Sequence, residues 1–265
     1  MFYIFLNIFL PFVIILEYMK TKNLHNAPLI CVFDSGIGGL NLLKACQDKL
    51  PFCNFVYVAD NYNVPYGNLP EEKILKLVNK KFCVINSLNP AAAVIACNTA
   101  TAVCVQYLRN KYSFPIIGIQ PPIKQAVKNG GSIAVFATQA TVKSSSFSEL
   151  LRLCGNDKTK VYPLKDLAQK IEKNVLRLDK LNVPDLFPQI EEDNIVLGCT
   201  HYSYVKNKLE LFYKKPIFDG IVGTVDHLRS FLGNFDHTPL KKQNLTFICG
   251  NFAKNRLIYS TLFEN

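Results

Sequence analysis

The sequence predicts an α/β fold with two similar domains, each built on a largely parallel sheet flanked by helices. Three observations support this prediction. Short apolar runs alternate along the chain with segments of helical spacing, as in parallel strands joined by helices. An apolar run that ends in a cysteine and small polar residues occurs twice, as VIACNTATA (94–102) and IVLGCTHYS (195–203). With 265 residues and 49% hydrophobic content, the chain is long enough to form two small cores.

The first half of the chain opens on a strand, a glycine-rich turn and a helix. PLICVF is an apolar run that ends at DSGIGG, and LNLLKACQDKL then has apolar residues at helical spacing. PEEKILKLVNKKFCVINSL begins with a proline and two acids, as helices commonly do. Pro65 and Gly67 fix a loop at 63–68. The expected strands of this half are 28–33, 53–60, 91–97 and 114–119, and the expected helices are 40–50 and 70–88.

The second half continues the alternation. Its expected strands are 131–138, 160–164 and 194–199, with helices at 141–154 and 166–178. No low-complexity linker marks a domain boundary. The repeated cysteine pattern predicts two similar domains, with the change from one to the other near 118–122.

Residues 1–18 are almost wholly apolar and allow two interpretations. The run is interrupted by an asparagine and a proline, and it has neither the basic start nor the small-residue cleavage site of a signal peptide. In the first interpretation the start is assigned too early, and Met19 begins the protein. In the second, the segment anchors the protein in a membrane, with Lys20 and Lys22 holding the following domain on the cytoplasmic side. We favour the first, so a membrane is a partner only if residues 1–18 are a real anchor.

The cysteine content and the charge argue against several classes of protein. The nine cysteines form no CxxC pair and several lie in apolar runs, which is typical of reduced thiols in a cytoplasmic protein. The spacing of cysteines and histidines is not that of zinc ligands, so no metal site is expected. The formal charge of +10 comes from scattered lysines without a basic block or an aromatic RNA-binding signature. We therefore expect no nucleic-acid partner.

Polar and reactive side chains gather where the predicted strands end. In open parallel sheets, ligands bind beyond the carboxyl ends of the strands. One such residue is easily accidental, but a set drawn from both halves predicts an active site in the cleft between two domains. The set consists of Asp34, Ser35, Asp60, Cys97, Asn98, Thr99, Cys199, Thr200 and His201.

The two cysteines in this set suggest a type of chemistry. A single cysteine after an apolar run is most often a buried strand residue. A thiol can also act as a nucleophile or, more rarely, as a general base if a neighbour activates it, and Asp34 and His201 are the candidates for that role. Two thiols in one cleft are redundant for nucleophilic attack. They are useful when a proton leaves one face of a carbon and returns on the other, which is racemisation or epimerisation without a cofactor.

Two loops are candidates for contacts with a substrate. DSGIGGL (34–40) lacks the GxxxxGK[ST] and GxGxxG forms of phosphate-binding loops. We interpret it as a tight turn whose N–H groups and Ser35 hydroxyl hold an anionic group such as a carboxylate. VPYGN (64–68) is either a structural loop or a loop laid against a small ligand.

Taken together and in this order, the motifs resemble those of the glutamate racemases in the aspartate/glutamate racemase superfamily. They are FDSGIGGL, YVADNYNVPYGN, VIACNTATA, FATQATVKSSSF and LGCTHY, and the resemblance runs from about Pro28 to near residue 260. It implies a first α/β domain of 28–119 plus about 222–265, and a second of 120–221, whereas the hydrophobic leader at 1–27 has no counterpart in the family. It also implies cofactor-independent interconversion of L- and D-glutamate in the cytoplasm, which supplies D-glutamate for peptidoglycan. Such proteins often form homodimers.

The same resemblance implies roles for individual residues. Cys97 and Cys199 are the two acid/base thiols, the first for the proton of the D-enantiomer and the second for that of the L-enantiomer. Asp34 tunes Cys97, and His201 tunes Cys199. Glu172 is the best match for an acid that assists near the second cysteine, or else it is a charge on the solvated face of an amphipathic helix. Substrate contacts are implied for Asp34, Ser35, Tyr66, Gly67, Asn98, Thr99, Thr138, Thr141, Thr200 and His201.

The sequence departs from the family pattern at two positions and leaves two alternatives open. Ser203 stands where the family usually has proline, and Gln120 stands where an apolar residue is common. One alternative is a related racemase for aspartate or another small acid, against which the DSGxGGL and PYG motifs argue. The other is a binding or regulatory protein that keeps the fold. The motifs contain both thiols as well as Asp34 and His201, and this argues against that alternative.

Overall fold

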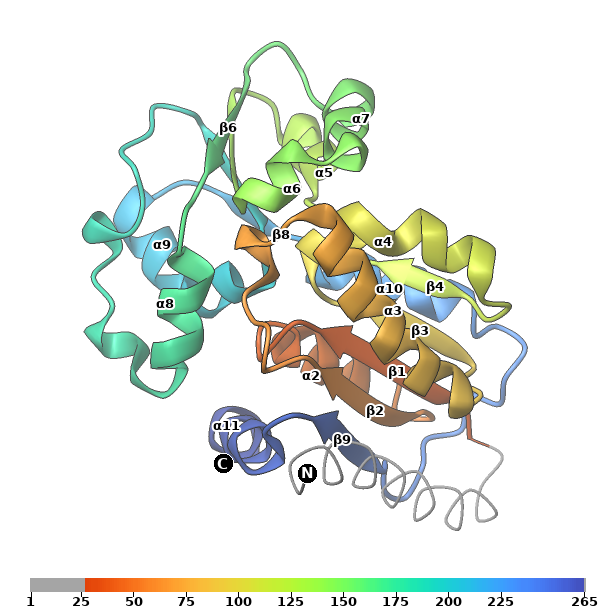
Figure 1. The fold of residues 1–265 in the computed structure, drawn as a ribbon. Coiled ribbons are helices and arrows are strands. Elements are labelled where there is room, and N and C mark those ends of the chain that lie inside the picture. The colour runs from red at the N-terminus through yellow and green to blue at the C-terminus, as the bar shows by residue number, and fades with distance from the viewer. Residues whose placement is uncertain (1–26, 265) are drawn as a thin grey trace.

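The computed structural model describes residues 27–264 and contains two parallel sheets (Figure 1). The five-stranded sheet has the order β4 (Ile116–Gly118), β3 (Ala92–Ile95), β1 (Leu29–Asp34), β2 (Asn54–Ala59) and β9 (Leu245–Cys249). The four-stranded sheet has the order β6 (Thr159–Pro163), β5 (Ile133–Ala137), β7 (Asn194–Gly198) and β8 (Ile217–Asp219). All the strand pairs in both sheets are parallel, which confirms the predicted fold class. The start at Met19 and the nature of residues 1–18 lie outside the described residues.

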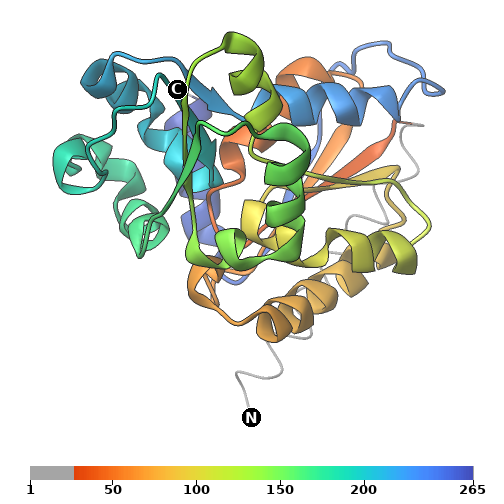
Figure 2. The ribbon, with the colours of Figure 1, turned by 90° about the horizontal axis from the view of Figure 1, so that it is seen from above.

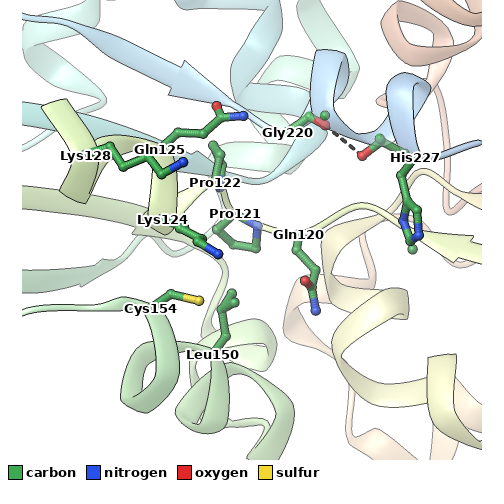
Figure 3. Close-up of a pocket in the computed structure, with 13 residues that line it drawn as sticks. Gln120, Pro121, Pro122, Lys124, Gln125, Lys128, Leu150, Cys154, Gly220 and His227 are labelled. Atoms are coloured by element: carbon green, nitrogen blue, oxygen red, sulfur yellow. Dashed lines mark hydrogen bonds between the residues drawn. The ribbon is translucent and has the colours of Figure 1, made fainter. Parts of the chain in front are cut away.

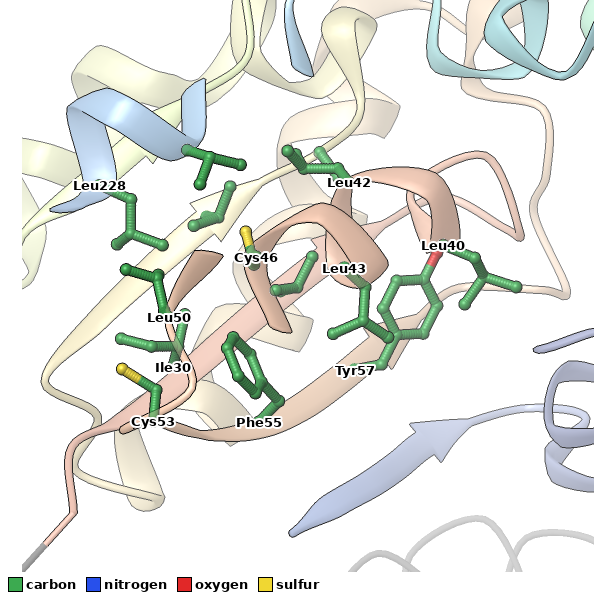
Figure 4. Packing of buried hydrophobic residues seen from close by; sticks show 14 of the residues in the cluster. Ile30, Leu40, Leu42, Leu43, Cys46, Leu50, Cys53, Phe55, Tyr57 and Leu228 are labelled. Carbon is green, nitrogen blue, oxygen red and sulfur yellow. The ribbon is translucent and has the colours of Figure 1, made fainter. Parts of the chain in front are cut away.

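Helices cover both faces of the five-stranded sheet. They are α2 (Leu40–Lys49), α3 (Glu71–Ser87), α4 (Asn98–Lys111), α10 (Ile221–Ser230) and α11 (Phe252–Phe263). Every residue of β1 and β2 is buried, as expected for strands covered on both sides. Since side chains alternate along a strand, Ile30 and Val32 pack with α2, α10 and α11, whereas Cys31 and Phe33 pack with α3 and α4. Figure 4 shows the first of these two clusters.

The four-stranded sheet is covered in the same way by shorter helices. They are α5 (Ile123–Asn129), α6 (Gln139–Lys143), α7 (Ser145–Cys154), α8 (Leu167–Asn174) and α9 (Lys206–Tyr213). Phe136 and Leu197 pack with α8 and α9, whereas Val135 and Val196 pack with α5 and α7. Short 3-10 helices occur at η2 (Tyr66–Asn68), η3 (Val175–Lys180), η4 (Val183–Asp185) and η5 (Thr200–Val205).

The chain passes between the two sheets twice. It leaves the five-stranded sheet after β4 and returns to it after β8, through Gly220 into α10. The C-terminal strand β9 pairs with β2 at the edge of the five-stranded sheet. Helix α11 follows β9 and contacts η3, which follows α8 on the other sheet. Figures 1 and 2 show the fold from two directions. The limits of the two domains remain a prediction.

The predicted elements differ from the structure in two ways: two strands are missed, and two predicted helices are wrong in their extent. Neither β8 nor β9 is predicted from the sequence, because β8 is only three residues long and β9 is a half-exposed edge strand. The helix expected at 141–154 is divided into α6 and α7 by Ser144, whose extended backbone and side chain cap α7. The helix expected at 166–178 ends at Asn174, and η3 after it contains a non-helical Arg177.

The nine cysteines all lie within the described part of the chain and are free there. Most are buried, including Cys97 and Cys199. No helix between residues 27 and 264 is both long and apolar enough to cross a membrane.

Candidate active site

The carboxyl ends of strands from both sheets bring the candidate residues together. β1 ends at Asp34, Cys97 lies just beyond β3, and Cys199 follows β7 directly. β1 and β3 are neighbours in the five-stranded sheet, whereas β7 belongs to the four-stranded sheet. The two edges touch, because Thr200 Oγ1 donates a hydrogen bond of 3.4 Å to Asp34 Oδ2.

Cys97 caps a helix and is held as a thiol. Its Sγ accepts a hydrogen bond of 3.4 Å from Ala100 N at the start of α4. Burial raises the pKa of Cys97 well above its usual range, and the charges of Asp34 and Cys199 act in the same direction. The Ala100 N–H and the Ser35 hydroxyl oppose this shift without cancelling it. At neutral pH the Cys97 sulfur therefore carries a proton that it can donate.

Asp34 is fully buried beside this thiol. Its Oδ1 accepts a hydrogen bond of 2.8 Å from Gly36 N within the glycine-rich turn. Burial raises the pKa of Asp34, although the charge of His201 and the Gly36 N–H lower it in part. Asp34 thus contacts the turn and Thr200, and its charge raises the pKa of Cys97.

His201 and Glu172 form a buried pair beside Cys199. His201 Nδ1 lies 3.9 Å from Cys199 Sγ, and His201 Nε2 lies 2.7 Å from Glu172 Oε2. Burial lowers the pKa of His201, but its hydrogen bonds to Cys199 and Glu172 and their charges outweigh this, so the pKa is raised. Burial raises the pKa of Glu172, but the hydrogen bond and charge of His201 outweigh it, so that pKa is lowered. Both shifts favour an imidazolium–carboxylate pair.

The structure excludes one of the two interpretations of Glu172. The residue is 5% exposed, so a charge on a solvated helix face is wrong. Besides bonding to His201, its Oε2 accepts a hydrogen bond of 3.1 Å from Ile37 N of the glycine-rich turn. The predicted anion-binding turn thus directs a backbone N–H at a carboxylate of its own chain.

Three threonines join the two sheets on the other side of the site. Thr99 Oγ1 lies 2.9 Å from Thr138 Oγ1 and 3.1 Å from Thr141 Oγ1, and the latter two lie 2.9 Å apart. Thr99 starts α4, whereas Thr138 caps α6. Beside them, Asn98 is 4% exposed and its Nδ2 has no hydrogen-bond partner within the described chain. A buried amide without a partner is rare and marks a donor available to a ligand.

The Tyr66–Gly67 loop packs against this triangle. A Cβ on Gly67 would lie 2.7 Å from Thr138 Cβ, so only glycine permits this approach. Tyr66 is buried, and its hydroxyl donates a hydrogen bond of 2.8 Å to Asp60 Oδ2. Tyr66 therefore lies near the site, but Asp60 already holds its hydroxyl. Lys81 Nζ lies 3.6 Å from the other Asp60 oxygen.

Two tyrosines that the sequence does not single out support the glycine-rich turn. Tyr57 hydroxyl donates a hydrogen bond of 2.8 Å to Gly36 O, and Tyr204 hydroxyl donates one of 2.7 Å to Ile37 O. Tyr57 lies within β2, where nothing in the sequence distinguishes it from a core residue. Tyr204 comes from the other sheet and follows the LGCTHY motif closely, which is the only signal that could have identified it.

Gly38 is a site where an added methyl group should destabilise the protein. A Cβ at this position would lie 2.6 Å from His201 Nδ1 and 2.7 Å from Thr200 Oγ1. We expect Gly38→Ala to lower the free energy of unfolding by about 1–3 kcal/mol, measured by urea denaturation. Gly233→Ala is the control, because a Cβ there meets no atom within 4 Å. Equal stability of the two variants would show that the turn yields at no cost.

A separate cavity lies at the connections between the two sheets. It has a volume of about 460 Å³ and is lined by both connections between the sheets, with Gln120, Lys124 and His227 among its residues (Figure 3). None of the predicted site residues lines this cavity. Gln120, where the sequence departs from the family pattern, lines this cavity and also a smaller one that is lined by Asn98 and Thr141.

Comparisons with known proteins identify the family of this chain. A family model described as Asp/Glu/Hydantoin racemase matches residues 66–228. Glutamate racemase from Clostridium acetobutylicum is 37% identical over 217 residues, covering 78% of this chain and 85% of the relative. The corresponding protein from Clostridium botulinum strain Alaska E43 is 37% identical over 241 residues, covering 85% and 92%.

Solved structures show the same fold. Glutamate racemase from Campylobacter jejuni superposes with a TM-score of 0.76 at 24% identity, covering 88% of this chain and 97% of that one. The Escherichia coli enzyme, solved with L-glutamate and the activator UDP-MurNAc-Ala, has a TM-score of 0.74 at 26% identity, covering 90% and 94%. The chain therefore belongs to the Asp/Glu/hydantoin racemase family, and its resemblance to the glutamate racemases within that family is confirmed.

Proposed function

We propose that the protein is a glutamate racemase that interconverts L- and D-glutamate without a cofactor, using Cys97 and Cys199 as a pair of acid/base groups. The observation that carries this proposal is the placement of two buried thiols at strand ends of different sheets, close enough that the charge of one raises the pKa of the other. A substrate carbon between them would have one sulfur on each face. The 37% identity to curated glutamate racemases supports glutamate as the substrate.

The two thiols have different surroundings, and this suggests the resting state. Cys97 is held as a protonated thiol beside Asp34. Cys199 lies beside His201, which Glu172 holds in the imidazolium form, and an imidazolium is a suitable partner for a thiolate. In this state the enzyme has one base and one acid, as each direction of racemisation requires.

Each turnover moves one proton in at one face and one out at the other. In the L-to-D direction, the Cys199 thiolate takes the Cα proton of L-glutamate, and the Cys97 thiol donates its proton to the opposite face. Cys199 is then a thiol and Cys97 a thiolate. The reverse reaction, or exchange of protons with water after product release, restores the starting state.

The remaining residues would hold the substrate. The unpartnered Asn98 Nδ2 supplies a buried donor for a carboxylate, and the hydroxyls of Ser35 and Thr200 lie beside the two thiols. The threonine triangle and the Tyr66–Gly67 loop form the side of the site between α4 and α6. We assign these groups to the two carboxylates and the amino group of glutamate.

We further propose that this is a cytoplasmic enzyme that supplies D-glutamate for peptidoglycan and acts as a homodimer. The curated relatives named glutamate racemase and the E. coli enzyme solved with UDP-MurNAc-Ala support the first part. The homodimer rests on the family resemblance, and sedimentation of the purified protein tests it. We retain the division into 28–119 with about 222–265 and 120–221, since both connections between the sheets lie at those limits.

Proton exchange in D₂O tests the activity directly. We expect the Cα–H signal of L-glutamate to disappear from the NMR spectrum while the optical rotation of the solution falls to zero. Aspartate under the same conditions should show neither change. Exchange of aspartate alone would favour a related racemase, and no exchange of either amino acid would favour a binding or regulatory protein.

A further inference from the structure

One oxygen of Glu172 is left unsatisfied by the site. Its Oε2 takes both hydrogen bonds, from His201 Nε2 at 2.7 Å and from Ile37 N at 3.1 Å. Its Oε1 is buried and has no hydrogen-bond partner within the described chain. An unsatisfied oxygen on a buried carboxylate is costly, so a donor is expected close by.

Lys254, in the first turn of α11, places its ammonium group near this oxygen. Its Nζ lies 3.9 Å from Glu172 Oε1, which is an ion pair but too long for a hydrogen bond. The lysine side chain is 44% exposed, so it is free to turn toward or away from the oxygen. After the effects of burial, His201 and the Ile37 N–H, the charge of Lys254 also favours the charged form of Glu172 and lowers its pKa.

The start of α11 is fastened to the five-stranded sheet. Asn255 and Asn61 exchange two side-chain hydrogen bonds of 3.0 and 3.3 Å. Tyr62 hydroxyl donates a hydrogen bond of 3.0 Å to Gly250 O. The backbone N of Lys254 donates to the capping Asn251 side chain at 3.0 Å. The five-stranded sheet therefore sets the position of Lys254.

Glu172 lies on α8, which packs on the four-stranded sheet. The contact from Lys254 therefore crosses from one sheet to the other, as does the hydrogen bond from Ile37 N. Helix α11 also contacts η3, the 3-10 helix that follows α8. Glu172 thus joins both sheets to the imidazole beside Cys199.

We propose that Lys254 is a positioning residue that donates to Glu172 Oε1 and thereby keeps the Glu172 carboxylate aligned on His201, so that the C-terminal helix supports proton transfer at Cys199 alone. This inference rests on the proposed function. Between residues 27 and 264, Asp34, the carboxylate beside Cys97, has no ion pair with a lysine, and its hydrogen bonds come from Gly36 N, Gly39 N and Thr200. Loss of the Lys254 charge should therefore slow one of the two proton transfers.

A one-sided effect has a distinctive kinetic signature. The two enantiomers are equally stable, so kcat/KM must fall equally in both directions and cannot reveal which thiol is affected. Primary isotope effects can reveal which thiol is affected. If transfer at Cys199 becomes slower, the isotope effect with Cα-deuterated glutamate rises for the enantiomer that Cys199 deprotonates. It falls for the other enantiomer, because removal of that deuteron no longer limits the rate.

The test compares Lys254→Met with the wild-type enzyme. We expect kcat/KM to fall roughly three- to tenfold, with the two isotope effects moving in opposite directions. Lys254→Arg should restore both, since it keeps a cation on a long side chain. Arg256→Gln is the matched control, because Arg256 lies on the same helix, is 45% exposed and pairs with Glu264 away from the site. It should behave as wild type.

The outcomes separate this inference from the function. An inactive wild-type enzyme would overturn the proposed function itself. An active wild type with a Lys254→Met variant that matches it would overturn only the role of Lys254. A variant whose two isotope effects move together, or that arginine does not restore, would indicate a merely structural contact and also overturn it.

Discussion

Replacing either Cys97 or Cys199 by serine is expected to abolish racemisation of glutamate while the protein stays folded. General acid–base groups typically contribute about 10²–10⁴-fold to a rate, so each variant should lose at least that factor in kcat. A serine hydroxyl fits the space of the thiol but loses its proton far less readily. Both cysteines are 7% exposed at strand ends, so the exchange changes little surface. Circular dichroism confirms folding, and polarimetry follows the reaction in both directions.

The two serine variants should differ in the exchange reaction that they retain. With only one thiol left, a proton can leave and return on the same face, which exchanges the Cα–H with solvent deuterium without inverting the carbon. We expect Cys97→Ser to exchange L-glutamate only and Cys199→Ser to exchange D-glutamate only, as measured by NMR in D₂O. This selectivity follows from placing one sulfur on each face of the substrate carbon.

Cys104→Ala is the matched control for these variants. Cys104 is a buried thiol on α4, the helix that Cys97 caps, and it has none of the hydrogen bonds that the described chain gives to the site residues. It should retain normal turnover. If either serine variant kept wild-type turnover in both directions, or exchanged both enantiomers equally, the two-thiol mechanism would be wrong.

The features that the sequence predicts well are those set by local pattern. Apolar runs that end in polar tips place Asp34, Cys97 and Cys199 at strand ends, because parallel strands all present their carboxyl ends at one edge. The alternation of strands and helices predicts the two parallel sheets, because parallel strands are joined by helices. β8 and β9 escape prediction because short or half-exposed strands have no distinctive pattern.

The features that the sequence does not predict depend on contacts between distant segments. Glu172 has the same local pattern whether it faces water or the interior, and its burial is decided by Ile37 N–H and His201 from other parts of the chain. Tyr57 and Tyr204 read as core residues until their hydroxyls are seen on the glycine-rich turn. Such contacts join segments that are distant in the sequence, so no local pattern reveals them.

The buried pair of Glu172 and His201 leads to a prediction on stability. Glu172→Gln removes the charge that stabilises the imidazolium, and breaking a buried ion pair by changing one partner is strongly destabilising. With the two side chains only 6% and 3% exposed, we expect the free energy of unfolding to fall by about 2–4 kcal/mol. Urea denaturation of the variant and the wild type measures the difference. Turnover should also fall, because His201 loses its orientation toward Cys199.

The loss of unfolding free energy caused by Glu172→Gln should depend on pH in a defined way. The pKa of Glu172 is lowered from 4.5 in the folded state, so its contribution is present above about 4.5 and is lost as the pH falls through the folded pKa. The pKa of His201 is raised above 6.5, so its contribution is present below about 6.5 and is lost as the pH rises through the folded pKa. The destabilisation by Glu172→Gln should therefore be largest between these two values.

A surface pair provides the contrast that makes this result specific. Glu149→Gln removes the carboxylate that binds Arg152 on α7, where both side chains are more than half exposed, and it should leave stability nearly unchanged at every pH. A Glu172→Gln variant whose loss of stability did not vary between pH 4 and pH 9 would show that glutamine merely packs worse than glutamate. The charge on Glu172 would then have no part in holding His201 as an imidazolium, and the proposed thiolate at Cys199 would lose its partner.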